Sequence, residues 1–184
     1  MFELDRFVAD CRAALTSDAP HKAVREVVAR AVSEPAAVLR AVGEPRRAEL
    51  RKLYGSAELT ILNVVWAPGM ILLPHDHRMW AVIGLYGGRE DNTFYRRAAT
   101  GLVDAGAKRL DVKDVTVLGR DVIHAVANPS RQFTGAIHVY GGDFFGTLRS
   151  EWDPDTREER PYDVQRAMQV FVDANERWRG ECAR

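Results

Sequence analysis

The first fifty residues carry apolar side chains at helical spacing. Apolar positions recur at steps of three and four, at Leu4, Phe7, Val8, Cys11 and Leu15. This stripe predicts an amphipathic helix that buries one face. Cys11 lies on the stripe and is predicted to be a small buried residue and not a reactive thiol. Two more helical stretches are expected, one over about 21–32 and a short one after Pro35, because proline suits the first turn of a helix.

From about residue 58 to residue 149 the apolar period changes to two. Short alternating segments are separated by glycine and proline turn signals. The expected strands are Leu59–Trp66, Met79–Tyr86, Asn92–Arg97, Lys108–Val112, Val115–Leu118, Val122–Ala127, Phe133–Tyr140 and Phe145–Arg149. No helical pattern lies between them, so the segment predicts an antiparallel sandwich or barrel and not alternating strands and helices.

The last part of the chain is expected to form a turn and a helix. The turn is Asp153-Pro154-Asp155, and the helix starts at about Pro161. Its buried face is expected at Val164, Met168, Phe171 and Val172. We therefore expect one domain over residues 1–184, with a helical segment at 1–50, a β-barrel core at 58–149, and a turn and C-terminal helix at 150–184.

Composition removes several classes of function. The 26 basic and 26 acidic residues cancel, so no general positive field favours nucleic acid or an acidic membrane as a partner. No apolar run approaches the length of a membrane span, and the first residues lack the basic start of a secretory signal. Two cysteines near opposite ends give no disulfide framework, so a cytoplasmic location is expected.

The histidines give the strongest chemical signal. His75 and His77 are two residues apart, so in a strand both side chains project to one face and form a two-point metal clamp. His124 lies near the start of a later expected strand, Val122–Ala127. A pair of this spacing also occurs with one histidine in a structural role and the other exposed. The pattern alone leaves both interpretations open.

The surrounding residues resemble the two metal-binding motifs of the cupin superfamily. Gly69 lies six residues before His75, and Asn128 lies four residues after His124. The resemblance covers about half of the chain. It implies a mainly β fold, the double-stranded β-helix or small jelly roll, with the histidines meeting in its mouth. An N-terminal helical segment and a C-terminal helix would flank this fold.

One acidic ligand of that motif is missing. Many metal-binding cupins have a glutamate four or five residues after the second histidine, where this chain has Ala81 and Val82. The nearest acids, Glu90 and Asp91, follow the Gly87-Gly88 turn and are expected to face away. The predicted site therefore offers three neutral imidazoles, His75, His77 and His124, and no carboxylate.

This departure narrows the resemblance to bacterial thiol dioxygenases of the cysteine dioxygenase family. The matching segments are His75-Asp76-His77, Trp80–Gly84, His124 and His138-Val139-Tyr140. The resemblance implies Fe(II) bound by the three histidines, beside a Ser-x-His-x-Tyr strand. Ala136 replaces the serine, so the resemblance implies a shortened pair, His138 and Tyr140, as the catalytic residues.

Arginines are the candidate substrate anchors, because a guanidinium binds a carboxylate through two parallel hydrogen bonds. Arg149 lies nine residues past Tyr140, the spacing of the anchor in the mercaptopropionate branch, to which the chain is most similar. Arg51 is the weaker candidate for the cysteine-branch anchor. Arg78, next to His77, either adds positive charge for an anionic substrate or points to solvent.

The sequence thus predicts an Fe(II)-dependent thiol dioxygenase that converts cysteine, mercaptopropionate or a similar mercapto-carboxylate and O2 to the sulfinate. Its expected partners are that thiol and O2, with no nucleic acid and no membrane. Two alternatives stay open. One is a cupin metalloenzyme with another metal and a non-thiol substrate, since three histidines and a water also form an open zinc site. The other is a cupin that binds a small ligand without catalysis.

Overall fold

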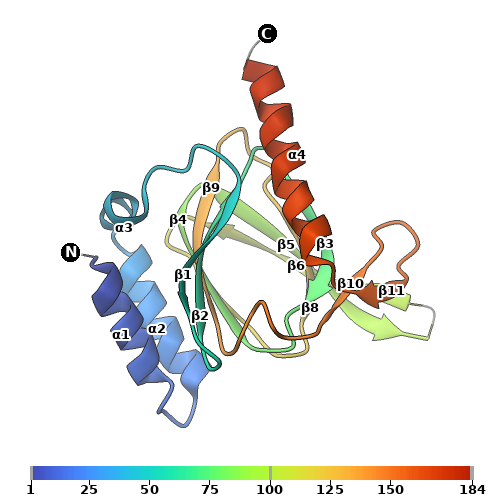
Figure 1. Cartoon of the computed structure of the whole chain (residues 1–184). Coiled ribbons are helices and arrows are strands. Elements are labelled where there is room, and N and C mark those ends of the chain that lie inside the picture. Colours follow the sequence, from blue (N-terminus) through green and yellow to red (C-terminus); the bar gives the residue numbers. More distant parts are fainter. Residues whose placement is uncertain (1, 100, 183–184) are drawn as a thin grey trace.

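The computed structural model describes residues 2–99 and 101–182. Three helices precede the strands and one follows them: α1 (Leu4–Ala14), α2 (Pro20–Val32), α3 (Pro35–Val42) and α4 (Val164–Cys182). The strands are β1 (Glu49–Gly55), β2 (Thr60–Trp66), β3 (Ile71–Asp76), β4 (Ala81–Gly87), β5 (Arg89–Ala98), β6 (Gly101–Asp111), β7 (Val115–Leu118), β8 (Ile123–Ala127), β9 (Thr134–Tyr140), β10 (Ser150–Trp152) and β11 (Glu159–Pro161). Helices α1–α3 lie to one side of the strands, and α4 crosses the other side (Figure 1).

The strands form two antiparallel sheets. One has the order β1-β2-β9-β4-β7, and the other has the order β11-β10-β3-β8-β5-β6. Strands β2, β3, β4 and β5 alternate between the two sheets, and so do β7, β8 and β9. This alternation is the topology of a jelly roll, in which two facing sheets enclose one core. The predicted fold class, a mainly β jelly roll with helices at both ends of the chain, is confirmed.

The sheet that contains β2, β9 and β4 is buried on both faces. Along β9, Ala136 and Tyr140 pack inside the barrel, whereas Ile137 and Val139 pack against the N-terminal helices. Because side chains alternate between faces, one strand serves both cores. This double burial explains why every residue of β2 and of β9 is buried.

The N-terminal helices follow their apolar stripes. Phe7 and Cys11 are the buried residues of α1, and Pro20 and Pro35 open α2 and α3. Burial raises the pKa of the Cys11 thiol to about 12, so the thiol stays protonated at neutral pH. The prediction that Cys11 is buried is confirmed. The side chain of Cys182 lies outside the described side chains.

The predicted strand list omits β1, β3, β10 and β11, and it includes one segment, Phe145–Arg149, that is not a strand. Strand β1 begins at Glu49, inside the segment expected to be helical, and its residues are exposed or half-buried. The predicted strand Phe145–Arg149 is a turn, in which the Asp143 carboxylate accepts hydrogen bonds from the backbone N–H groups of Phe145 and Gly146. An Asx turn of this kind competes with strand pairing.

The predicted buried face of the last helix is also wrong. Of the expected residues, Phe171 is buried, whereas Val164, Met168 and Val172 are 41%, 39% and 46% exposed. The buried face is Ala167, Phe171 and Ala174. Small alanine side chains allow α4 to approach the barrel closely, and a pattern based on large apolar residues misses them. Within the described residues, no helix is long and apolar enough to span a bilayer.

The contact between α2 and β4 gives a first prediction. A Cβ at Gly84 would lie 2.4 Å from Val28 Cγ1 and 3.1 Å from Val32 Cγ1. Gly84→Ala should therefore lower the free energy of unfolding by about 1–3 kcal/mol, measured by urea denaturation. Gly119→Ala is the matched control, because its Cβ would meet only Val122 Cγ2, at 3.9 Å. If Gly84→Ala and Gly119→Ala are equally stable, this close approach does not limit packing.

Candidate metal centre

Three histidine rings converge inside the barrel. His75 on β3 lies directly opposite His124 on β8 in the strand register, and His77 follows the end of β3. His77 Nε2 lies 3.2 Å from His75 Nε2 and 3.4 Å from His124 Nε2. All three residues are buried, and their ligand atoms lie within 4.8 Å of one another. The structure thus brings together the three predicted ligands, and a group of this kind can hold a metal ion.

Hydrogen bonds at Nδ1 turn the Nε2 atoms of two rings toward the centre. His75 Nδ1 lies 2.9 Å from the Leu73 carbonyl oxygen, and His124 Nδ1 lies 2.7 Å from Asn92 Oδ1. Both oxygens only accept, so each Nδ1 carries the hydrogen and each Nε2 keeps its lone pair for a metal. Such outer partners fix the tautomer and ring orientation of metal-binding histidines. The donor set therefore fits a divalent transition metal.

Burial keeps these imidazoles neutral, as metal ligands must be. Desolvation lowers the pKa of His75 to about 4. Desolvation also places the pKa of His77 and of His124 well below the ordinary value, and the neighbouring imidazoles add to this effect. A ring that is already deprotonated at neutral pH binds a cation without first losing a proton.

Between the two histidines of the motif, Asp76 faces away from the centre. Its Oδ1 accepts a hydrogen bond from the Ser150 backbone N–H, and its Oδ2 lies 2.8 Å from Arg78 Nε. Arg78 has φ 56°, so the chain turns sharply just after His77. Its guanidinium is held at the outer face, between Asp76 and Glu159, and does not line the histidine pocket. The structure therefore shows no contact between Arg78 and the centre.

The candidate catalytic pair lies beside the rings. His138 and Tyr140 both face inward from β9, and His138 Nδ1 lies 3.0 Å from the Tyr140 hydroxyl. The Tyr140 ring meets the His77 ring edge-on, with centroids 5.0 Å apart. Burial raises the pKa of Tyr140 well above its ordinary range, so the phenol keeps its proton. Ala136 lies on the same face of β9, in the barrel core.

The expectation that Glu90 faces away is wrong. Its side chain is fully buried and points inward from β5, whereas Asp91 faces outward and pairs with Arg89. Glu90 Oε2 accepts a hydrogen bond from Trp66 Nε1 at 2.8 Å, and its Oε1 accepts one from Asn92 Nδ2 at 2.9 Å. Glu90 and Asp91 are the second and third residues of β5, so their side chains point to opposite faces of the sheet. Glu90 is the one that faces the core.

Arg149 is the arginine that reaches the pocket. It is 8% exposed and lines the same cavity as the three histidines, His138 and Tyr140. The free volume of this cavity is about 30 Å³. The guanidinium lies 4.0 Å from the ring centroids of both Phe144 and Tyr162. An apolar pocket with a few convergent polar groups is the usual form of a small-ligand site.

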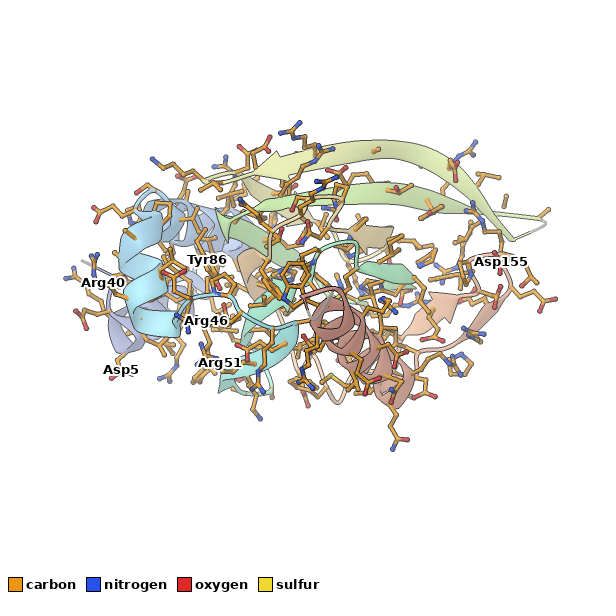
Figure 2. The ribbon with its side chains drawn as sticks, turned by 90° about the horizontal axis from the view of Figure 1, so that it is seen from above. Asp5, Arg40, Arg46, Arg51, Tyr86 and Asp155 are labelled. Atoms are coloured by element: carbon orange, nitrogen blue, oxygen red, sulfur yellow. The ribbon has the colours of Figure 1, made fainter. Side chains whose placement is uncertain are left out.

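Arg51 does not reach this pocket. Its guanidinium donates to the Val42 carbonyl and lies 3.5 Å from Glu49. Figure 2 shows it near Arg46, on the side of the molecule where the N-terminal helices pack. Asn128, the last residue of the second motif, has a structural role: its amide donates to the carbonyls of Trp66, Ala67 and Gln132.

No family model matches the chain. Among solved structures, it is similar to an RmlC-like cupin family protein with a double-stranded β-helix fold from Methanocaldococcus jannaschii, at 12% identity and TM-score 0.45, covering 52% of this chain and 81% of that one. It is also similar to the DMSP lyase DddQ from Ruegeria pomeroyi, at 17% identity and TM-score 0.47, covering 59% and 53%.

A third similar structure is Peruvianin-I, a cysteine peptidase from Thevetia peruviana latex, at 20% identity and TM-score 0.40, covering 46% of this chain. The chain spans about half the length of Peruvianin-I and of the lyase, 51% and 53%. At these identities the likeness concerns the arrangement of strands, and it carries no activity over to this chain.

The lowered pKa of His75 gives a prediction about the metal-free protein. The unfolded chain binds a proton at this ring near pH 6.5, whereas the folded protein binds it only near pH 4. The free energy of unfolding should therefore fall as the pH falls from about 7 to 4, by roughly 3 kcal/mol for this ring alone. Urea denaturation across this range measures the slope.

Two histidine variants separate this contribution from other titrations. His75→Gln should flatten the slope by about one proton, and His21→Gln, which changes a histidine on α2 outside the cluster, controls for the substitution itself. Equal slopes in the parent and in His75→Gln would show that the cluster does not hold this ring neutral.

Proposed function

We propose that the protein is an Fe(II)-dependent thiol dioxygenase that acts on a small mercapto-carboxylate. The observation that carries the proposal is the combination of three neutral imidazoles, with no carboxylate among them, and one buried arginine in the same pocket. The first feature supports a site that binds a thiolate anion next to a cation. The second supports a substrate with a separate carboxylate.

Among the residues that the structure describes, Arg149 has no ion-pair partner in contact with it at the pocket. No carboxylate pairs with it among the described residues, and its buried Nε has no hydrogen-bond partner there. Its Nη1 donates to the Phe144 carbonyl, and aromatic rings lie against the guanidinium. A buried charge without a counterion is costly. A bound carboxylate would supply the counterion and would accept a hydrogen bond from Nε.

The thiol and O2 together account for all atoms and electrons of the proposed reaction. A thiol and O2 give a sulfinate and a proton: two S–O bonds form, the O–O bond breaks, sulfur loses four electrons and O2 gains them. Fe(II) held by His75, His77 and His124 would favour the thiolate over the thiol and carry electrons between sulfur and O2. No further reductant or cofactor is required.

The residues around the centre have separate tasks in this proposal. Arg149 binds the carboxylate and so orients the sulfur toward the three histidines. The Tyr140 hydroxyl lies beside the reacting group, and His138 fixes the position of that hydroxyl. The apolar walls, which include Leu72, Phe144 and Phe171, limit the access of water.

Oxygen uptake tests the proposed function directly. The purified protein, loaded anaerobically with Fe(II), should consume O2 with cysteine, 3-mercaptopropionate or mercaptosuccinate and form one sulfinate per O2. His124→Ala should lose both bound iron and uptake, because a ligand and its lone pair are removed. A full zinc complement without uptake would support another metalloenzyme. Tight binding of a ligand without turnover would support a binding protein.

Arg149→Ala tests the carboxylate anchor. Loss of a buried charge pair costs about 2–5 kcal/mol. We therefore expect kcat/KM for the mercapto-carboxylate to fall about 100-fold, mostly through KM, with iron content unchanged. Turnover of cysteamine, a thiol without a carboxylate, should change less than about threefold.

Arg109→Ala is the matched arginine control, because Arg109 is exposed on β6 and pairs with Asp111. Parent-like kinetics of Arg149→Ala with the mercapto-carboxylate would show that the substrate carboxylate binds elsewhere.

A further inference from the structure

Glu90 is a buried carboxylate that the proposed reaction does not use. It contacts no ligand atom of the three-histidine centre and does not line the pocket. It lies behind the pocket wall, where β5 of one sheet faces β2 and β9 of the other. Two donors, Trp66 Nε1 and Asn92 Nδ2, satisfy one oxygen each. A carboxylate kept in a barrel core at this desolvation cost calls for an explanation.

The neighbouring residue His138 explains why the Glu90 carboxylate is buried here. His138 Nε2 lies 3.8 Å from Glu90 Oε2, and this buried nitrogen has no hydrogen-bond partner among the described residues. The distance is too long for a hydrogen bond but is within the range of an ion pair. A lone pair on Nε2 would face the negative carboxylate and be repelled. A hydrogen on Nε2 would be attracted, so the carboxylate favours the His138 tautomer that carries its hydrogen on Nε2.

The other ring nitrogen then has a fixed role. With the hydrogen on Nε2, neutral His138 offers a lone pair at Nδ1, 3.0 Å from the Tyr140 hydroxyl. Nδ1 then accepts the hydrogen bond of the phenol. A carboxylate, an imidazole and a hydroxyl in line act in this way in hydrolytic triads, where the carboxylate holds the tautomer.

We propose that Glu90 is a positioning residue that acts through His138 to fix the hydrogen bonding of the Tyr140 hydroxyl. In this position it supplies, from the opposite sheet, an orienting partner for His138 that Ala136 on β9 lacks. The Glu90–His138–Tyr140 arrangement is a property of the fold and holds whatever ligand the pocket takes. Its effect on turnover rests on the proposed function.

The first test reads the histidine without any reaction. The metal-free protein, labelled with ¹⁵N at its five histidines, should show His138 with the hydrogen on Nε2, and His138→Gln identifies its signals. In Glu90→Gln the negative charge beside Nε2 is removed, so the form with the hydrogen on Nε2 should lose population to the form with the hydrogen on Nδ1. Asp91→Asn is the matched control, since Asp91 is the next residue and faces outward. An unchanged His138 tautomer in Glu90→Gln would overturn the proposal.

Tyr140→Phe tests the same arrangement from its other end. The hydroxyl is lost but Glu90 remains, so the hydrogen should stay on Nε2. A hydrogen that moves to Nδ1 in this variant would show that Tyr140, and not Glu90, sets the tautomer. This arm decides the proposal even if Glu90→Gln fails to fold.

The second test concerns turnover of the iron-loaded enzyme, with rates expressed per bound iron. Glu90→Gln should lower kcat about 10- to 100-fold and change KM less than about threefold, and Glu90→Asp should recover part of the loss. The double variant Glu90→Gln/Tyr140→Phe should be no slower than Tyr140→Phe alone, because Glu90 acts through the hydroxyl. Fully additive losses would contradict that route.

The outcome of the ¹⁵N test and the outcome of the turnover test are independent of each other. If no thiol is oxidised by the parent enzyme, the proposed function is wrong, and the ¹⁵N spectra still decide whether Glu90 positions His138. If thiols are oxidised but the tautomer ignores Glu90, the proposed function stands and the positioning role is rejected.

Discussion

The site depends on the burial of three imidazoles as neutral rings aimed at one point. Their Nε2 atoms lie 3.2 and 3.4 Å apart in a region that excludes water. Rings this close repel one another if charged, and desolvation penalises the charged form further. The barrel therefore holds deprotonated ligands in place before any cation arrives. The Leu73 carbonyl and the Asn92 amide complete this by fixing the hydrogens on the far nitrogens of His75 and His124.

The strand geometry that builds the centre also builds the rest of the fold. Strand β9 carries Ala136, His138 and Tyr140 on its inner face, and Ile137 and Val139 on its outer face. The outer residues anchor helices α1–α3, and the inner ones form one wall of the pocket. A shift of one residue in the β9 register would exchange the two sets. Packing of the helices thus secures the positions of the residues around the centre.

The sequence predicted the parts of the structure that follow local periodicity. Strand alternation placed His75 and His77 on one face, and short strands without intervening helices predicted an antiparallel sandwich or barrel. The resemblance to cupins added His124 and the jelly roll. Arg149 was found through a family spacing, although its predicted strand is a turn. Glu90 was missed because its orientation depends on where β5 begins, and no local pattern marks that residue. The close fit of α4 was missed because Ala167 and Ala174 give a weak apolar signal.

The charge of Glu90, which the sequence analysis missed, has to be considered together with the charge of Arg149, which it predicted. The described groups at the pocket include one cation, Arg149, and one carboxylate behind its wall, Glu90. Their charges sum to zero although the two groups form no ion pair, and the three histidines of the centre are neutral. A divalent ion would then leave two positive charges in a low-dielectric cavity, where an uncompensated charge is costly. A ligand with a thiolate and a carboxylate carries two negative charges and restores neutrality, whereas a simple thiolate leaves one charge unbalanced. Under the proposed function, Glu90 therefore affects selectivity as well as geometry, since without it the pocket would carry one more positive charge.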